Sequence, residues 1–252
     1  MIRFRISGYV FRISEPVVLE RVEILSLIEQ FQFNFLDDSR WQFIVSGLKN
    51  TIIITFFAVL LGVFLGFLIA IVRSTHDKTG KLKILNVICR VYLTVIRGTP
   101  TMIQLLIMNF VIFGAVSINK IIVGGLAFGI NSGAYVAEIV RSGIMSIDQG
   151  QTEAGRSLGL NFTQTMRLII IPQAFKNVLP ALVNEFIVLI KETSIIGYIG
   201  MMDLTKGAML IQSRTYNAFM PLLAAAAIYL IVVMVLTFFM NKLERRLRTS
   251  ER

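Results

Sequence analysis

The chain alternates long apolar runs with short charged segments. Five apolar runs cover residues 51–72, 98–119, 121–137, 178–199 and 215–241. Each is close to the ~20 residues that an α-helix needs to cross the hydrocarbon core of a bilayer. The pattern therefore predicts an all-α, polytopic membrane protein with about five transmembrane helices.

Composition supports this class and excludes several others. Of 252 residues, 55% are hydrophobic and 16% charged, and the mean hydropathy is +0.74. A soluble domain carries about 25% charged residues. The single cysteine, Cys89, and the single histidine, His76, offer neither a disulfide nor a metal site. We therefore expect no metal, no cofactor bound by this chain and no enzymatic activity.

Basic residues gather in alternate connections between the apolar runs. Residues 73–97 and 138–177 hold at least four Lys or Arg each, and five follow residue 241. The connection at residue 120 holds one, and residues 200–214 hold two. By the positive-inside rule, the C-terminus and the 138–177 loop are predicted to be cytoplasmic and the N-terminus external. This bias explains the net charge of +10 without any nucleic-acid partner.

The first 40 residues differ from the rest, with five basic and six acidic side chains. Residues 17–35 mix apolar and acidic positions at near-helical spacing, so they form either an interfacial helix or a poorly ordered arm. We therefore divide the chain into an N-terminal arm, residues 1–40, and a transmembrane domain, residues 41–252.

The long loop at residues 138–177 has the pattern of a short helix between two turns. Thr152 is expected to cap the helix, and Gly159 fits a helix C-terminus or tight turn because it tolerates positive φ. Residues 161–171 then restart a helix that Pro172 perturbs. Such an element suits docking into a groove on a partner; an ordinary amphipathic loop is the alternative.

Four spaced motifs resemble a known family. Glu153-Ala154-Gly155, Gly159 and Ile169-x-Ile171-Pro172 resemble the EAA signature of ABC importer permeases, with Gly155 where Ala is usual and Ile171 where Leu is usual. Three more segments resemble the polar amino-acid branch of that family: Arg97-Gly98-Thr99-Pro100, residues 131–138 and residues 184–187. The resemblance covers roughly residues 43–248, so it implies a type I importer permease fold for the transmembrane domain.

The resemblance also implies partners. In the family this loop forms a coupling helix that fits a cleft in a separate ATP-binding subunit. The corresponding residues here are Glu153, Ala154, Gly155, Arg156, Ser157, Leu158 and Gly159. The chain lacks a Gly-x-x-x-x-Gly-Lys-Ser/Thr phosphate loop, so ATP and Mg would bind the partner ATPase. An extracellular or periplasmic binding protein and a second permease copy, or a related permease, complete the expected importer in a bacterial inner or plasma membrane.

Two carboxylates in the fourth run are candidates for substrate binding, because ionisable groups in spans are costly. Glu185 and Glu192 are seven residues apart and so share a helix face. Two carboxylates on one helix face suit the α-ammonium of an amino acid, or a guanidinium or second ammonium on its side chain. Alternatively, Glu192 pairs with Lys191 near the outer end of the span and Glu185 lies alone inside.

Polar and small residues interrupt the third run at Asn131, Ser132, Gly133 and Tyr135. They permit local unwinding, which in transporters exposes backbone N–H groups to a substrate carboxylate. Close helix packing through small residues is the alternative. The resemblance favours a substrate role, since in the family an unwound segment here lies beside the amino acid.

The second run begins with a break. Pro100 follows Thr99 and is expected to bend this span near its cytoplasmic start. Gln104, further along, either lines the transport path or makes a helix–helix hydrogen bond.

The sequence therefore predicts a permease subunit of an ABC importer for polar or charged L-amino acids. The two glutamates favour a basic substrate such as arginine, with glutamine second. Two alternatives stay open: an ion-driven secondary transporter, for which two related halves would be expected, and a non-transporting membrane scaffold that docks a cytoplasmic partner.

Overall fold

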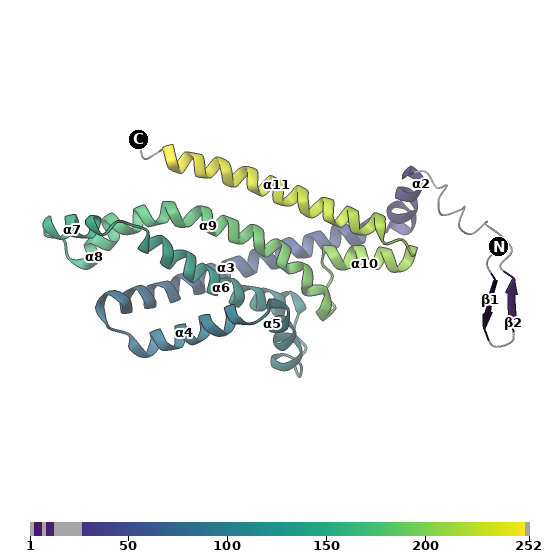
Figure 1. Ribbon diagram of the computed structural model, residues 1–252, viewed down its shortest axis with the longest axis horizontal. Helices are drawn as coiled ribbons and strands as arrows, with labels where there is room; N and C mark the ends of the chain where they lie inside the picture. The colour runs from purple at the N-terminus through teal and green to yellow at the C-terminus, as the bar shows by residue number, and fades with distance from the viewer. Residues whose placement is uncertain (1–2, 7–8, 13–26, 250–252) are drawn as a thin grey trace.

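The computed structural model describes residues 3–6, 9–12 and 27–249. The long helices are α3 (Trp41–Thr79), α6 (Lys120–Met145), α9 (Ile171–Glu192) and α11 (Phe219–Thr249) (Figure 1). Shorter α-helices are α2 (Leu27–Phe31), α4 (Lys83–Gly98), α5 (Thr101–Ile107), α7 (Gln149–Ser157), α8 (Phe162–Thr165) and α10 (Leu204–Thr215). The π-helical turns are η1 (Gln32–Leu36), η3 (Met108–Ile112) and η4 (Met166–Ile170), and the 3-10 turns are η2 (Asp37–Ser39) and η5 (Thr193–Ile199). Ahead of the helices, β1 (Arg3–Ile6) and β2 (Tyr9–Arg12) pair antiparallel.

The predicted all-α, polytopic fold class is confirmed. Among the described residues, three helices are long and apolar enough to cross a membrane, within Trp41–Asp77, Lys120–Met145 and Phe219–Arg246. The bent pair formed by α4 and α5 with η3 qualifies as a fourth span if it is counted as one. α9 has 22 residues, which is the length of a span, but it is not among these helices.

The second span differs from its prediction. A bend at Pro100 is present, but it joins two helices, α4 and the α5–η3 segment, which meet at 108°. Thr99 adopts extended backbone (φ −122°, ψ 145°), as expected of a residue before proline. The expectation that residues 83–97 are a loop is therefore wrong, because they form α4.

The centre of the molecule is the packing of α6 along α3 (Figure 1). Small residues bring the two backbones together. A Cβ on Gly66 would lie 2.4 Å from Cγ1 of Val136, and one on Gly62 would lie 3.0 Å from Cβ of Ser132. Ile54 and Phe128, both fully buried, fill the core beside these contacts, together with residues of α5, α9 and η5.

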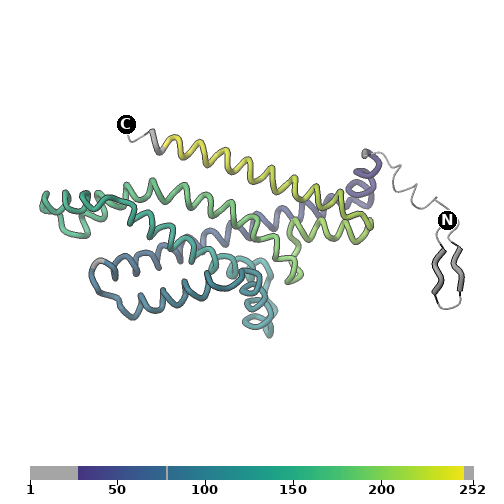
Figure 2. The backbone as a smooth tube through the Cα atoms, in the orientation of Figure 1, coloured from purple at the N-terminus to yellow at the C-terminus, as the bar shows by residue number. Residues whose placement is uncertain are grey.

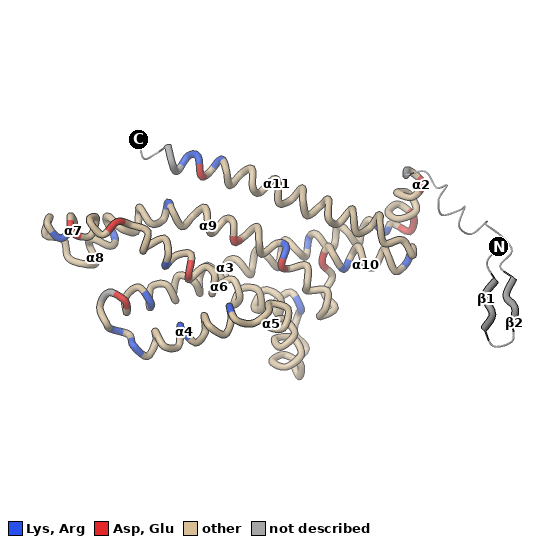
Figure 3. The backbone as a smooth tube through the Cα atoms, viewed as in Figure 1, with Lys and Arg blue, Asp and Glu red and all other residues tan. Residues whose placement is uncertain are grey.

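The connections predicted to be cytoplasmic all lie at one end of the bundle. The α3–α4 connection, α7, α8 and the last turns of α11 share this end, here named the α7 end (Figures 1 and 2). α2 and α10 lie at the opposite end (Figure 2). Charged residues are dense at the α7 end, whereas the middle of the long helices is mostly uncharged (Figure 3).

The segment before α3 folds back on the opposite end. Phe35 packs with Ile44 of α3 and Leu204 of α10 in one buried cluster. Arg40 is 8% exposed, donates a hydrogen bond to the carbonyl of Phe33, and pairs with Asp38 at 2.6 Å. Of the interfacial helix predicted at 17–35, residues 17–26 lie outside the described residues. The division at residues 40 and 41 stays a prediction.

Candidate functional site

A carboxylate–hydroxyl pair joins the third and fourth predicted spans. Oγ of Ser132 on α6 donates a hydrogen bond of 2.9 Å to Oε1 of Glu185 on α9. Ser132 is 1% exposed and Glu185 is partly buried. Among the described residues no Lys or Arg lies within 4 Å of Glu185. The charge of this carboxylate is therefore available to a cationic ligand.

Glu192 lies two turns further along α9 and is also partly buried. The two carboxylates are seven residues, ~10 Å, apart along the axis of α9 and lie on the same face of that helix. Lys191 precedes Glu192 directly and carries the opposite charge. The structure thus leaves Glu185 as the inner, less compensated carboxylate of the pair.

Asn131 lies next to this pair and connects α6 to the bend at Pro100. Its Nδ2 donates a 3.0 Å hydrogen bond to Oε1 of Gln104. Nε2 of Gln104 donates to the carbonyl of Ile96 (2.7 Å) and to Oγ1 of Thr99 (2.8 Å). The helix–helix hydrogen bond is therefore the arrangement that Gln104 adopts. Asn131 is 1% exposed, and its Oδ1 has no partner among the described residues.

α6 is a continuous helix through Asn131, Ser132 and Gly133. The predicted unwinding is therefore wrong, and the packing alternative holds. A Cβ on Gly133 would lie 3.0 Å from Oη of Tyr92 and 3.1 Å from Cβ of Leu65, so the helices pack tightly against this glycine. Oη of Tyr92 donates a hydrogen bond to the carbonyl of Ile130, which fastens α4 to this helix.

Tyr135 and Glu138 belong to a charged cluster nearer the α7 end. The ring of Tyr135 lies 5.9 Å from the guanidinium of Arg97. Glu138 accepts a hydrogen bond from Arg73 of α3 and lies 3.9 Å from both Arg97 and Arg141. The sequence does not predict this cluster, because its members come from three helices. A glutamate in an otherwise apolar stretch is the available signal.

The predicted coupling element forms α7, but its cap differs from the prediction. Asp148, not Thr152, caps α7, because Oδ1 of Asp148 accepts the N–H of Gly150 at 2.7 Å. Gly159 has φ +76°, as predicted for a turn after the helix. Asn161 and Gln164 then form a capping box that starts α8.

The residues expected to contact a partner divide into an exposed and a buried set. Glu153 and Arg156 are exposed, and Leu158, an apolar side chain, is 77% exposed. Ala154, Ser157 and Gly159 are exposed as well. Gly155 is buried, and a Cβ on it would lie 2.7 Å from Cγ2 of Thr165. The close contact with Thr165 explains why a residue without a side chain occupies position 155. The exposed side chains of α7 remain accessible to a partner protein.

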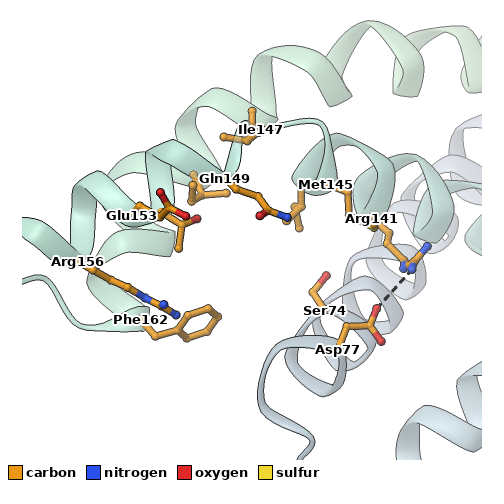
Figure 4. Close-up of a pocket in the computed structure, with 12 residues that line it drawn as sticks. Ser74, Asp77, Arg141, Met145, Ile147, Gln149, Glu153, Arg156 and Phe162 are labelled. Atoms are coloured by element: carbon orange, nitrogen blue, oxygen red, sulfur yellow. Dashed lines mark hydrogen bonds and ion pairs between the residues drawn. The ribbon is translucent and has the colours of Figure 1, made fainter.

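A cavity of about 500 Å³ separates part of α7 from the ends of α3 and α6. Asp77 of α3 and Arg141 of α6 form an ion pair of 3.4 Å on one side, and Glu153 and Arg156 lie on the other (Figure 4). α7 therefore projects from the bundle as a separate short helix. Among the described residues no group of three or more His, Cys, Asp or Glu could hold a metal ion.

Comparisons with known proteins identify the family of the chain. Residues 58–249 match the family described as binding-protein-dependent transport system inner membrane component. The chain is 40% identical over 207 residues to the putative glutamine transport system permease protein GlnP of Rickettsia typhi, covering 81% of this chain and 93% of that protein. It is 36% identical over 211 residues to the arginine transport system permease protein ArtQ of Bacillus subtilis, covering 83% and 94%.

Solved structures give the same result. The crystal structure of an amino acid ABC transporter with histidines is similar at a TM-score of 0.77 and 43% identity, covering 84% of this chain and 98% of that one. An inward-facing structure of the MetNI methionine ABC transporter has a TM-score of 0.67 at 20% identity, covering 82% and 97%, which shows the fold alone.

Proposed function

Because the chain belongs to the family of binding-protein-dependent transport system inner membrane components, we propose that it is the permease subunit of an ATP-driven importer of polar or charged L-amino acids. The observation that carries the proposal is the Ser132–Glu185 pair, an uncompensated carboxylate between two membrane-depth helices. The glutamine and arginine permeases of similar sequence, and the amino acid transporter of similar structure, support the amino-acid class.

The substrate preference that we propose is basic, arginine-like, with glutamine second. A charged group at membrane depth is costly unless a partner compensates it. Within the described part of the chain, Glu185 has one hydrogen bond and no Lys or Arg within 4 Å, and Glu192 adds a second negative charge on the same helix. A guanidinium or ammonium would compensate one of these charges, and a basic amino acid carries two cationic groups. Glutamine, whose amide donates hydrogen bonds without charge, would satisfy only the hydrogen-bonding capacity of Glu185.

Coupling to ATP hydrolysis is assigned to α7 and the turn that follows it. Glu153, Arg156 and Leu158 are exposed there and offer one negative, one positive and one apolar contact. Such a mixed, projecting surface suits a cleft on a cytoplasmic ATPase, which would carry ATP and Mg. In this orientation the C-terminus is cytoplasmic, and the opposite end of the bundle faces a periplasmic or extracellular binding protein. A second permease chain completes the transport path.

Uptake of labelled arginine tests the proposal, in bacterial cells lacking this chain and in cells with it restored. Unlabelled lysine, histidine, glutamine, glutamate and cystine serve as competitors. Restored uptake that lysine and histidine compete supports the importer and the basic preference. Competition led by glutamine keeps the importer and rejects the basic preference. Uptake that persists when the partner ATPase is inactivated would indicate an ion-driven transporter, and no uptake of any labelled solute would indicate a scaffold.

A further inference from the structure

α4 carries two different stripes along its length. Lys83, Arg90 and Arg97 are seven residues apart, so they share one face of the helix. A neighbouring face is apolar and exposed, with Ile88 59% and Val91 58% accessible. Ile84 and Val95 extend the apolar face in both directions. A basic stripe and an exposed apolar stripe therefore run side by side along α4.

A pocket of about 420 Å³ opens beside the basic stripe. Its charged lining consists of Arg73 from α3, Arg90 and Arg97 from α4, and Glu138 from α6. Three guanidinium groups thus face one carboxylate. Thr94 adds a hydroxyl group to the lining. The pocket consequently carries an excess of positive charge and several hydrogen-bond donors.

Glu138 cannot neutralise this excess, because it is already shared. It accepts a hydrogen bond from Arg73 and lies 3.9 Å from both Arg97 and Arg141. Arg90 is exposed and has no carboxylate within 4 Å among the residues that the structure describes. Nε of Arg73 is buried and also has no partner there. The positive charge of the pocket therefore exceeds its negative charge, so the pocket suits an anionic ligand.

We propose that this pocket binds the phosphate headgroup of an anionic phospholipid, whose acyl chain lies along the apolar stripe of α4. The planar guanidinium group of arginine can donate two parallel hydrogen bonds to phosphate oxygens and carries the opposite charge. Arg90 is seven residues, ~10 Å, into α4 from its start at the α7 end, and arginine side chains reach towards the interface from such depths. The predicted cytoplasmic leaflet at that end is the one that attracts basic protein segments. The apolar stripe favours a lipid over free phosphate, because phosphate has no acyl chain to pack against it.

Native mass spectrometry of the full chain with its ATPase, purified with defined lipid, tests the proposal. We expect retention of phosphatidylglycerol and not of phosphatidylcholine. Arg90→Gln should weaken phosphatidylglycerol binding ~5-fold, the effect of one basic residue near a membrane surface. Lys176→Gln removes a charge from α9, outside the pocket, and should leave retention unchanged. Equal retention by Arg90→Gln and the unaltered protein would overturn the proposal.

A second variant separates lipid from free anion. Val91→Asn alters the exposed apolar stripe without touching the guanidinium groups, so it should lower lipid retention and leave the fold intact. Inorganic phosphate at millimolar concentration should not displace the lipid. Displacement by phosphate, together with unchanged retention in Val91→Asn, would mean that the pocket binds small anions rather than lipid. If phosphatidylcholine were retained as well as phosphatidylglycerol, the charge of the headgroup would not determine binding, and the proposal would be overturned.

Discussion

The hydrogen bond between Ser132 and Glu185 joins the two helices that α7 and α8 connect. Ser132 lies 13 residues before the last residue of α6, and Glu185 lies 14 residues after the first of α9. At 1.5 Å per residue, both positions are ~20 Å from the coupling element. A displacement of α7 by a partner would therefore reach both members of the pair through helical segments of similar length.

Replacing Glu185 with glutamine removes the charge and keeps the side-chain shape. The new amide can still accept the hydrogen bond of Ser132, so the fold should persist. We expect arginine uptake to fall ~10-fold or more, the effect of losing a charge-assisted hydrogen bond of about 1.5–3 kcal/mol. Glutamine uptake should change less. The measurement is competition uptake with both labelled amino acids.

Ser132→Ala is the matched control, because it removes the hydrogen bond and retains the carboxylate. Its effect should be smaller, and similar for arginine and glutamine. An equal loss of all substrates in Glu185→Gln, at normal membrane abundance, would mean that Glu185 serves the fold and not selection.

Charge reversal at Glu153 should release the ATPase. The side chain is exposed on α7, ahead of the turn that carries the exposed, apolar Leu158, so Glu153→Lys alters the docking surface and not the bundle. Co-purification of the ATPase with a tagged permease measures the effect. Ser213→Lys, an exposed change on α10 at the opposite end, is the control and should retain the ATPase. Undiminished co-purification with Glu153→Lys would contradict the coupling assignment.

Truncation separates two parts of the N-terminal arm. Removing residues 1–26 leaves Phe35 and Arg40 in place and should preserve transport. Removing residues 1–40 takes Phe35 out of its cluster with Ile44 and Leu204. Losing a buried aromatic side chain costs about 3–5 kcal/mol, so the second truncation should melt at a lower temperature in detergent. Equal melting temperatures would show that this packing does not stabilise the domain.

Local patterns in the sequence are sufficient to predict most of the helices and a bend at Pro100, but not the helix α4 that precedes it. Charged residues delimit α3, α6 and α11, and Gly159 marks the turn after α7. The pattern does not predict α4, because Arg90 and Arg97 interrupt its apolar character, although in the folded chain they lie along one edge of the helix. Thr and Asp both cap helices well, so sequence alone does not rank Thr152 against Asp148.

The Ser132–Glu185 pair could not be predicted, because its members are 53 residues apart. Their register depends on how closely α6 approaches α9, for example at Gly143, where a Cβ would lie 2.2 Å from Cγ2 of Val178. Residue type alone predicts unwinding at Gly133. In the structure the same glycine packs closely against Tyr92 within a continuous helix, so tertiary packing outweighs its low helix propensity.

A glycine-to-alanine exchange at Gly47 should destabilise the protein, although alanine is the better helix former by up to ~1 kcal/mol. A Cβ at Gly47 would lie 2.3 Å from the backbone oxygen of Asp203. That backbone cannot yield easily, because Oδ2 and Oδ1 of Asp203 accept the N–H groups of Thr205 and Lys206 at 3.0 Å and begin α10. Overpacking of this kind costs about 1–3 kcal/mol, so the melting temperature in detergent should fall.

Gly125→Ala provides the matched control in the interior of α6. The nearest atom to its added Cβ is Cβ of Phe57 at 3.5 Å, an ordinary van der Waals contact. Helix propensity should therefore dominate at this position, and the melting temperature should stay equal or rise. If Gly47→Ala and Gly125→Ala shifted the melting temperature in the same direction, the close approach of α10 to α3 would not be what requires glycine at position 47.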